Sequence, residues 1–180
     1  MQQYPDIYRK VSIRIIFKEN KMKITIITVG KIKEKFYRDA IDEYAKRLSK
    51  YCKFEIIEVA DEKTPDKCSD TEEQMILSKE AERVLKNIRQ DMYVYALAIK
   101  GKKLDSVTFA NEINSLGLNG KSSIAFIIGG SLGLHDSVLK RADRHLSFSD
   151  MTFPHQLMRV ILSEQIYRCF RIIANEPYHK

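Results

Sequence analysis

The chain has 180 residues, of which 44% are hydrophobic and 31% charged, and its formal net charge is +7. This length suits one domain with a core, and the composition excludes a disordered chain. No apolar run approaches the roughly 20 residues that cross a bilayer, which excludes a membrane-spanning protein. The cysteines Cys52, Cys68 and Cys169 are far apart and odd in number. They argue against disulfides and a metal site, and favour reduced thiols in a cytoplasmic protein.

Residues 1–21 differ from the rest of the chain. Charged residues interrupt their apolar ones and no small-residue cleavage site follows, so they are not typical of a signal peptide. Met22 is followed at once by a strand pattern. We therefore expect residues 1–21 to be an N-terminal extension, disordered or a start-site artefact, and residues 22–180 to form a single domain. The alternation of Val11–Phe17 leaves an additional strand open.

From Lys23 onward, apolar runs typical of buried strands alternate with stretches of helical spacing. In chain order the patterns predict a strand at Ile24–Val29, a helix at Lys33–Tyr51, a strand at Phe54–Val59, a helix at Thr71–Ile88, a strand at Tyr93–Ile99, a helix at Ser106–Leu116, a strand at Ser123–Ile128, a helix at Asp136–Ala142, a strand at Arg144–Phe148 and a helix at Pro154–Ala174. This alternation predicts an α/β domain whose mostly parallel sheet carries helices on both faces.

Three glycines follow the fourth predicted strand directly, in the segment Ile127–Gly133 with sequence IIGGSLG. Glycine lets a ligand approach the backbone closely, and ligands of α/β proteins bind beyond the carboxyl ends of the strands. The segment indicates a site for a nucleotide-like ligand, or alternatively a tight turn without a ligand. It matches neither the phosphate-binding loop of nucleoside triphosphatases nor the dinucleotide fingerprint, which disfavours a nucleotide- or NAD-binding protein.

A second candidate loop, Leu146–His155 with sequence LSFSDMTFPH, joins the last predicted strand to the last helix. Its polar side chains suit a polar ligand edge and its apolar ones suit an adenine face, Ser149 and Thr152 in the first group and Phe148, Met151 and Phe153 in the second. The alternative is a capped turn that packs its aromatic residues into the core. His155, on the first turn of the helix, suits a base, a phosphate contact or a cap.

The third candidate is the C-terminal segment Asn175–Lys180, with sequence NEPYHK. Chain ends are usually frayed. An aromatic ring, an imidazole and a cation together are also suited to closing over a flipped base by stacking and phosphate contact. The basic net charge agrees with such a polyanionic partner.

These segments in combination resemble one known family. The matching segments are Ile24–Lys31 (ITIITVGK), Leu97–Lys102 (LAIKGK), Phe126–Gly133 (FIIGGSLG), Ser147–Arg159 (SFSDMTFPHQLMR), Glu164–Arg168 (EQIYR) and Asn175–His179 (NEPYH). They resemble the RlmH family of bacterial SPOUT (trefoil-knot) enzymes, which methylate N3 of a pseudouridine in large-subunit ribosomal RNA. The resemblance covers the chain from Met22 to Lys180.

The resemblance implies a C-terminal trefoil knot, a homodimer, S-adenosylmethionine as the cofactor, and the ribosome with its large-subunit RNA as the partner. It implies neither a metal nor a membrane. The implied cofactor-binding residues are Leu97, Gly129, Phe148, Ser149, Asp150, Met151, Thr152 and Phe153. The implied catalytic residues are His155, Arg159, Tyr178 and His179. Our hypothesis is that His155 or His179 assists deprotonation of the base, while Arg159 holds phosphate or developing charge.

Two alternatives follow from the same fold. One is a SPOUT methyltransferase that acts on transfer RNA, with the same cofactor and another target. The other is a non-catalytic RNA- or ribosome-binding module, which need not retain affinity for S-adenosylmethionine. Cofactor binding separates this module from the enzymes, and the RNA that receives the methyl group separates the two enzymes.

Overall fold

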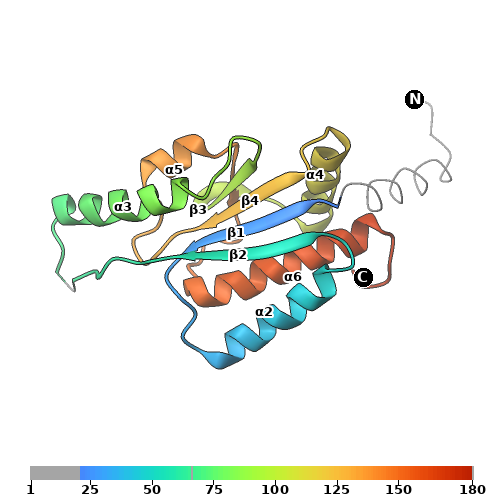
Figure 1. Cartoon of the computed structure of the whole chain (residues 1–180), viewed down its shortest axis with the longest axis horizontal. Helices are drawn as coiled ribbons and strands as arrows, with labels where there is room; N and C mark the ends of the chain where they lie inside the picture. Colours follow the sequence, from blue (N-terminus) through green and yellow to red (C-terminus); the bar gives the residue numbers. More distant parts are fainter. Residues whose placement is uncertain (1–20, 66, 180) are drawn as a thin grey trace.

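The computed structural model describes residues 21–65 and 67–179, so the predicted extension, apart from Lys21, lies outside the described residues. A five-stranded sheet forms the centre of the molecule, with strand order β2-β1-β4-β3-β5 and every neighbouring pair parallel (Figure 1). The strands are β1 (Lys23–Val29), β2 (Lys53–Val59), β3 (Tyr93–Lys103), β4 (Ser123–Ile128) and β5 (Arg144–Ser147). The prediction of a parallel α/β sheet is confirmed.

Helices cover both faces of this sheet, as predicted. One face carries α2 (Lys35–Leu48), α4 (Ser106–Leu118) and α6 (His155–Ile173), and the other carries α3 (Asp70–Leu85) and α5 (Asp136–Arg141). Strand β1 shows why both faces are apolar, because its side chains alternate between two separate cores. Ile24 and Ile26 pack on the α6 side, whereas Ile27 and Val29 pack on the α3 side.

The observed elements match the predicted ones with shifts of four residues or fewer at their ends. The largest shift is in β3, which continues to Lys103 instead of ending at Ile99. Leu146 of β5 is paired with both Leu97 and Lys102, so residues 98–101 form an irregular bulge between the two pairings. This extension depends on a strand more than 40 residues away in the chain, which a local pattern does not contain.

Gly101 lies at the centre of this bulge, directly against β5. A Cβ atom at this position would be 2.7 Å from the carbonyl carbon of Leu146, so only glycine allows the backbones to approach this closely. The segment 98–103 therefore crosses closely over the end of β5, just before the chain leaves that strand for α6.

Because all five strands are parallel, their carboxyl ends share one edge of the sheet, and the two candidate loops lie there. Helix α6 begins at the same edge and runs back to the opposite end of the molecule (Figure 1). Its 19 residues correspond to a length of about 28 Å. None of the helices described is long and apolar enough to cross a bilayer.

Candidate cofactor cavity and active site

A cavity of about 430 Å³ opens at the carboxyl edge of the sheet, between Leu97–Ile99 of β3 and the loops that follow β4 and β5. This volume falls in the usual range for small-molecule sites, roughly 300–1,000 Å³. Seven of the eight predicted cofactor-binding residues line it, namely Leu97, Gly129, Phe148, Ser149, Met151, Thr152 and Phe153. The structure therefore brings together the two loops and the end of β3 that sequence analysis selected separately.

The glycine loop after β4 presents backbone to this cavity. Gly130 and Gly133 form a bridge, and the amide of Gly133 donates to the carbonyl of Gly130 at 3.2 Å. A Cβ atom on Gly129 would lie 2.2 Å from the carbonyl oxygen of Gly133, so a side chain at this position forces the turn open. The turn is thus closed on itself, and it leaves room for a ligand against the main chain.

The loop between β5 and α6 forms the facing wall. The Ser147 hydroxyl donates to the Ser149 carbonyl at 3.0 Å, and the Ser149 hydroxyl accepts from the Met151 amide at 3.0 Å. Met151 and Phe153 are 74% and 38% exposed. The alternative of a simple capped turn requires these two side chains to pack into the core. They do not, so they remain available to an apolar ligand face.

Asp150 is the one predicted cofactor residue that does not line the cavity. Its carboxylate is exposed and forms an ion pair with Lys103 at the end of β3. The family resemblance implied Asp150 together with its neighbours Ser149 and Met151, and of these three only the neighbours line the cavity. In the described structure its role is to join the β5–α6 loop to the extended end of β3.

Arg159 also lies outside the cavity, fully buried beneath the first turn of α6. Its guanidinium donates to Glu58 of β2 at 2.7 Å and to the carbonyls of Val29 and Gly30 at 2.9 and 3.0 Å. Burial lowers the pKa of Arg159, while the carboxylate of Glu58 opposes that shift. These three bonds use Nη1 and Nη2 and direct the guanidinium toward Glu58 and the end of β1, while its Nε has no hydrogen-bond partner among the described residues.

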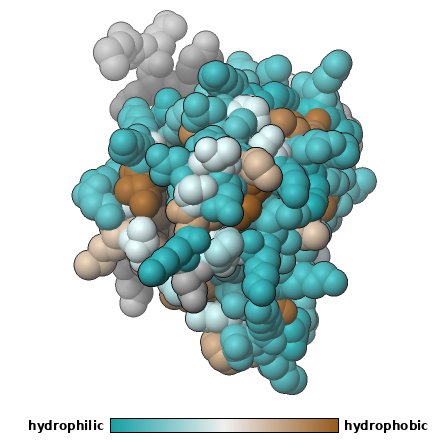
Figure 2. Space-filling model, turned by 90° about the vertical axis from the view of Figure 1, so that its left-hand side faces the viewer, coloured by the Kyte–Doolittle hydropathy of each residue, from teal (hydrophilic) through white to brown (hydrophobic). Residues whose placement is uncertain are grey.

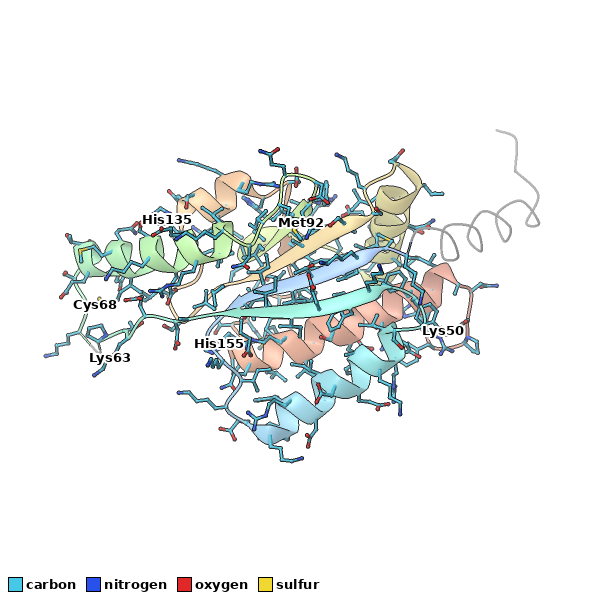
Figure 3. The ribbon with its side chains drawn as sticks, viewed as in Figure 1. Lys50, Lys63, Cys68, Met92, His135 and His155 are labelled. Atoms are coloured by element: carbon cyan, nitrogen blue, oxygen red, sulfur yellow. The ribbon has the colours of Figure 1, made fainter. Side chains whose placement is uncertain are left out.

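His155 is the first residue of α6 and lines the cavity (Figure 3). Burial lowers the pKa of its imidazole below the ordinary value, the positive charges of Arg159 and Lys33 lower it further, and Asp61 opposes them. The imidazole is therefore neutral near pH 7 and able to accept a proton.

Tyr178 and His179 lie at the other end of α6. The Tyr178 hydroxyl donates to Glu164 at 3.1 Å, and its ring packs edge-on against Tyr167 with centroids 5.0 Å apart. Nδ1 of His179 lies 3.5 Å from the guanidinium of Arg168. Within one chain, the structure does not bring these residues to His155.

Sequence analysis missed some residues that line the cavity. Leu132 and Gly133 lie inside the glycine motif that indicated the site, so that motif already contained their signal. Ile99 carried a weaker signal, as an apolar residue at the predicted end of a strand. In the described ranges, no group of three or more histidine, cysteine, aspartate or glutamate side chains is arranged to hold a metal ion.

Comparison with known proteins agrees with this fold. A family model described as "Predicted SPOUT methyltransferase" matches residues 22–179. A protein of Bifidobacterium adolescentis named "Ribosomal RNA large subunit methyltransferase H" is 65% identical over 159 residues, which is 88% of this chain and all of that protein. A protein of the same name from Clostridium beijerinckii is 60% identical, and one named "Putative ribosomal RNA large subunit methyltransferase H" from Methanococcus maripaludis is 62% identical, both with the same coverage.

Among solved structures, the tRNA (m1G37) methyltransferase of Aquifex aeolicus is similar in fold, with a TM-score of 0.52 and 18% identity. The alignment covers 89% of this chain and 75% of that one. This likeness concerns the fold alone.

The parallel α/β sheet and the glycine-lined cavity beyond β4, together with the match to the family model, identify the class as SPOUT methyltransferases. The chain belongs to the SPOUT methyltransferase family. Enzymes of this family take the methyl group from S-adenosylmethionine. The cavity fits such a cofactor, because bare backbone at Gly129 and apolar side chains at Met151 and Phe153 suit a nucleoside.

Replacing Gly129 with alanine should weaken S-adenosylmethionine binding roughly tenfold or more, because the added methyl group forces the glycine turn apart. Isothermal titration calorimetry measures this affinity. Gly117→Ala in α4 is the matched control, since its Cβ meets only the flexible Met22 side chain, at 3.3 Å. Wild-type affinity in Gly129→Ala would place the cofactor elsewhere.

Proposed function

We propose that this protein transfers a methyl group from S-adenosylmethionine to N3 of a pseudouridine in large-subunit ribosomal RNA, on the assembled ribosome in the cytoplasm. The observation that carries the proposal is the cavity between the glycine loop and the β5–α6 loop, with His155 on its wall. Its support from relatives is a 65% identity that extends over the whole of a protein named as a ribosomal RNA large subunit methyltransferase.

The cavity residues divide the work of binding and orientation. Leu97, Gly129 and the residues of the segment 148–153 other than Asp150 hold the nucleoside part of the cofactor, which supplies an electrophilic methyl group when bound. Exposed Met151 and Phe153 exclude water from the space in which the base enters. Holding the attacking nitrogen in line with the methyl group contributes much of the rate, because it removes the entropy cost of alignment.

The remaining chemical task is removal of the N3 proton. His155 is better placed for this than His179, because it lies on the cavity wall and its lowered pKa keeps the imidazole neutral. Arg159 then acts as a positioning residue, since its bonds to β1 and β2 hold the start of α6 where His155 is needed.

Completing the site with Tyr178 and His179 requires a second chain. These residues follow α6 and pack back on its second half, where the Tyr178 hydroxyl reaches Glu164, about 14 Å along the helix from His155. A symmetric homodimer with antiparallel α6 helices brings the tail of one protomer to the cavity of its partner. Apolar side chains exposed at the cavity support such a contact, namely Ile99, Met151 and Phe153. Figure 2 looks onto this end, where hydrophobic patches lie between hydrophilic side chains.

Basic residues at the same end suit an RNA partner. Lys31, Lys33 and Lys35 are exposed in and after the β1–α2 loop, and the Lys33 amide donates to Gln156 beside His155 at 2.8 Å. With the net charge of +7, this places positive charge next to the cavity, where phosphates of a bound RNA are needed.

Methyl transfer from labelled S-adenosylmethionine tests the function. With ribosomes from a strain that lacks this gene, we expect label in large-subunit RNA, at N3 of a pseudouridine, and little with free ribosomal RNA. Label only in transfer RNA would show that the substrate is transfer RNA, with the same cofactor. No label in any RNA, together with no cofactor binding, would show that the protein is a non-catalytic RNA- or ribosome-binding module.

The lowered pKa of His155 predicts an acidic limb in the pH profile of turnover. Above its pKa the imidazole is neutral and accepts the proton, so turnover should fall as the pH drops through this pKa, which lies below the ordinary histidine value of about 6.5. His155→Gln should lower turnover about a hundredfold and remove this limb, with S-adenosylmethionine affinity largely retained. His145→Gln, at an exposed position outside the cavity, is the control. An unchanged profile in His155→Gln would assign the base elsewhere.

Mixing two inactive variants tests the shared site. Gly129→Ala damages the cavity of its own chain, and His179→Ala damages only the tail. If tail and cavity come from different chains, mixed dimers carry one intact site, and about a quarter of wild-type turnover should return. Measuring turnover after the two variants are unfolded and refolded together decides this, with each variant refolded alone as the control. No recovery from a mixture that forms dimers would contradict the shared site.

A further inference from the structure

The segment after α6 is held by a group of side chains around Glu176. The Glu176 carboxylate accepts from Lys50 at 2.7 Å and from the Tyr51 hydroxyl, and it forms an ion pair with Arg171, whose Nε lies 3.0 Å away. Lys50 and Tyr51 follow α2, whereas Arg171 belongs to α6. One carboxylate therefore ties the tail to two different helical segments. Lys50 and His155 are labelled at opposite ends of the molecule in Figure 3.

Electrostatics favours the ionised carboxylate at this position. Glu176 is half-buried, and its burial alone would raise its pKa. The hydrogen bonds from Lys50 and Tyr51 and the charge of Arg171 outweigh that cost and hold the pKa of Glu176 below its ordinary value. Charge-assisted hydrogen bonds of this kind are stronger than neutral ones.

Arg171 extends the same group to the following residues. Its guanidinium also donates to the Tyr167 hydroxyl at 2.8 Å and to the Pro177 carbonyl at 3.1 Å. Tyr167 in turn is the ring on which Tyr178 packs. A continuous set of contacts therefore runs from Glu176 to Tyr178.

The backbone alone does not account for this ordered tail. Asn175 has a φ of 53°, a left-handed conformation that asparagine tolerates better than most residues and often adopts just after a helix. The Asn175 and Glu176 amides donate to the Ile172 and Arg171 carbonyls at 3.0 and 2.9 Å and close this turn. The turn ends at Glu176, and since chain ends normally fray, the side-chain bonds of Glu176 are what hold the residues that follow it.

We infer that Glu176 is a positioning residue for the proposed reaction, which orients Tyr178 and His179 toward the target base. The inference rests on the proposed function, in which these two residues complete the site. Glu164 accepts directly from the Tyr178 hydroxyl, but it belongs to α6 itself and pairs with Arg168 one turn later. Glu176 is the residue that joins the tail to the segment after α2, and so fixes the direction in which the tail leaves α6.

The variant Glu176→Gln in the full-length protein tests this inference, because it removes the charge and keeps the shape. We expect turnover on ribosomes to fall about tenfold while S-adenosylmethionine affinity stays within about twofold of wild type. Amide hydrogen exchange of residues 175–179, measured by mass spectrometry, should become faster. Glu176→Asp, which keeps the carboxylate, should recover part of the turnover.

Glu82→Gln is the matched control, since it removes a carboxylate from an exposed ion pair with Lys86 near the end of α3. It should leave turnover and tail exchange unchanged. Unchanged tail exchange in Glu176→Gln, or faster exchange with full turnover, would overturn the positioning role. A wild-type protein that methylates no ribosomal RNA would overturn the proposed function, and the positioning role with it, whereas an active wild type with a fully active Glu176→Gln would overturn this inference alone.

Discussion

The geometry of the site depends on the hydrogen bonds of one buried group, the guanidinium of Arg159. It joins the first turn of α6 to Glu58 of β2 and to the two carbonyls at the end of β1. A charge buried this completely is tolerated only with its partners in place, and loss of one partner from such a pair typically costs about 3–5 kcal/mol. The position of His155 depends on these bonds, because the orientation of the start of α6 determines where the imidazole faces.

The cavity and the tail solve different physical problems. At the cavity, the glycine turn and the exposed apolar side chains offer a surface for a flat, largely apolar ligand group. At the tail, burial and the carboxylate of Glu164 raise the pKa of Tyr178 to about 12, so the phenol stays protonated and remains a hydrogen-bond donor. The cavity is thus suited to binding a ligand by shape, and the tail to directed polar contacts. Within a single chain the two lie apart.

Most of the fold follows from local sequence patterns, because strands buried on both faces and amphipathic helices carry their period in the chain itself. The two loops of the cavity were also predictable, since glycines and a proline mark the ends of β4 and the start of α6. What sequence did not contain is side-chain direction. Arg159 is one turn from His155 and points into the sheet, Asp150 turns to Lys103, and β3 extends only because β5 pairs with it.

The length of helix α6 limits how this protein can vary in evolution. In the proposed dimer, its 19 residues set the spacing between the wall of one cavity and the tail that serves the partner's cavity. One inserted or deleted residue shifts the far end by about 1.5 Å and rotates it by about 100°. Such a change would move Tyr178 from one side of the helix to another. Relatives of this enzyme should therefore tolerate substitutions in α6 more readily than changes in its length.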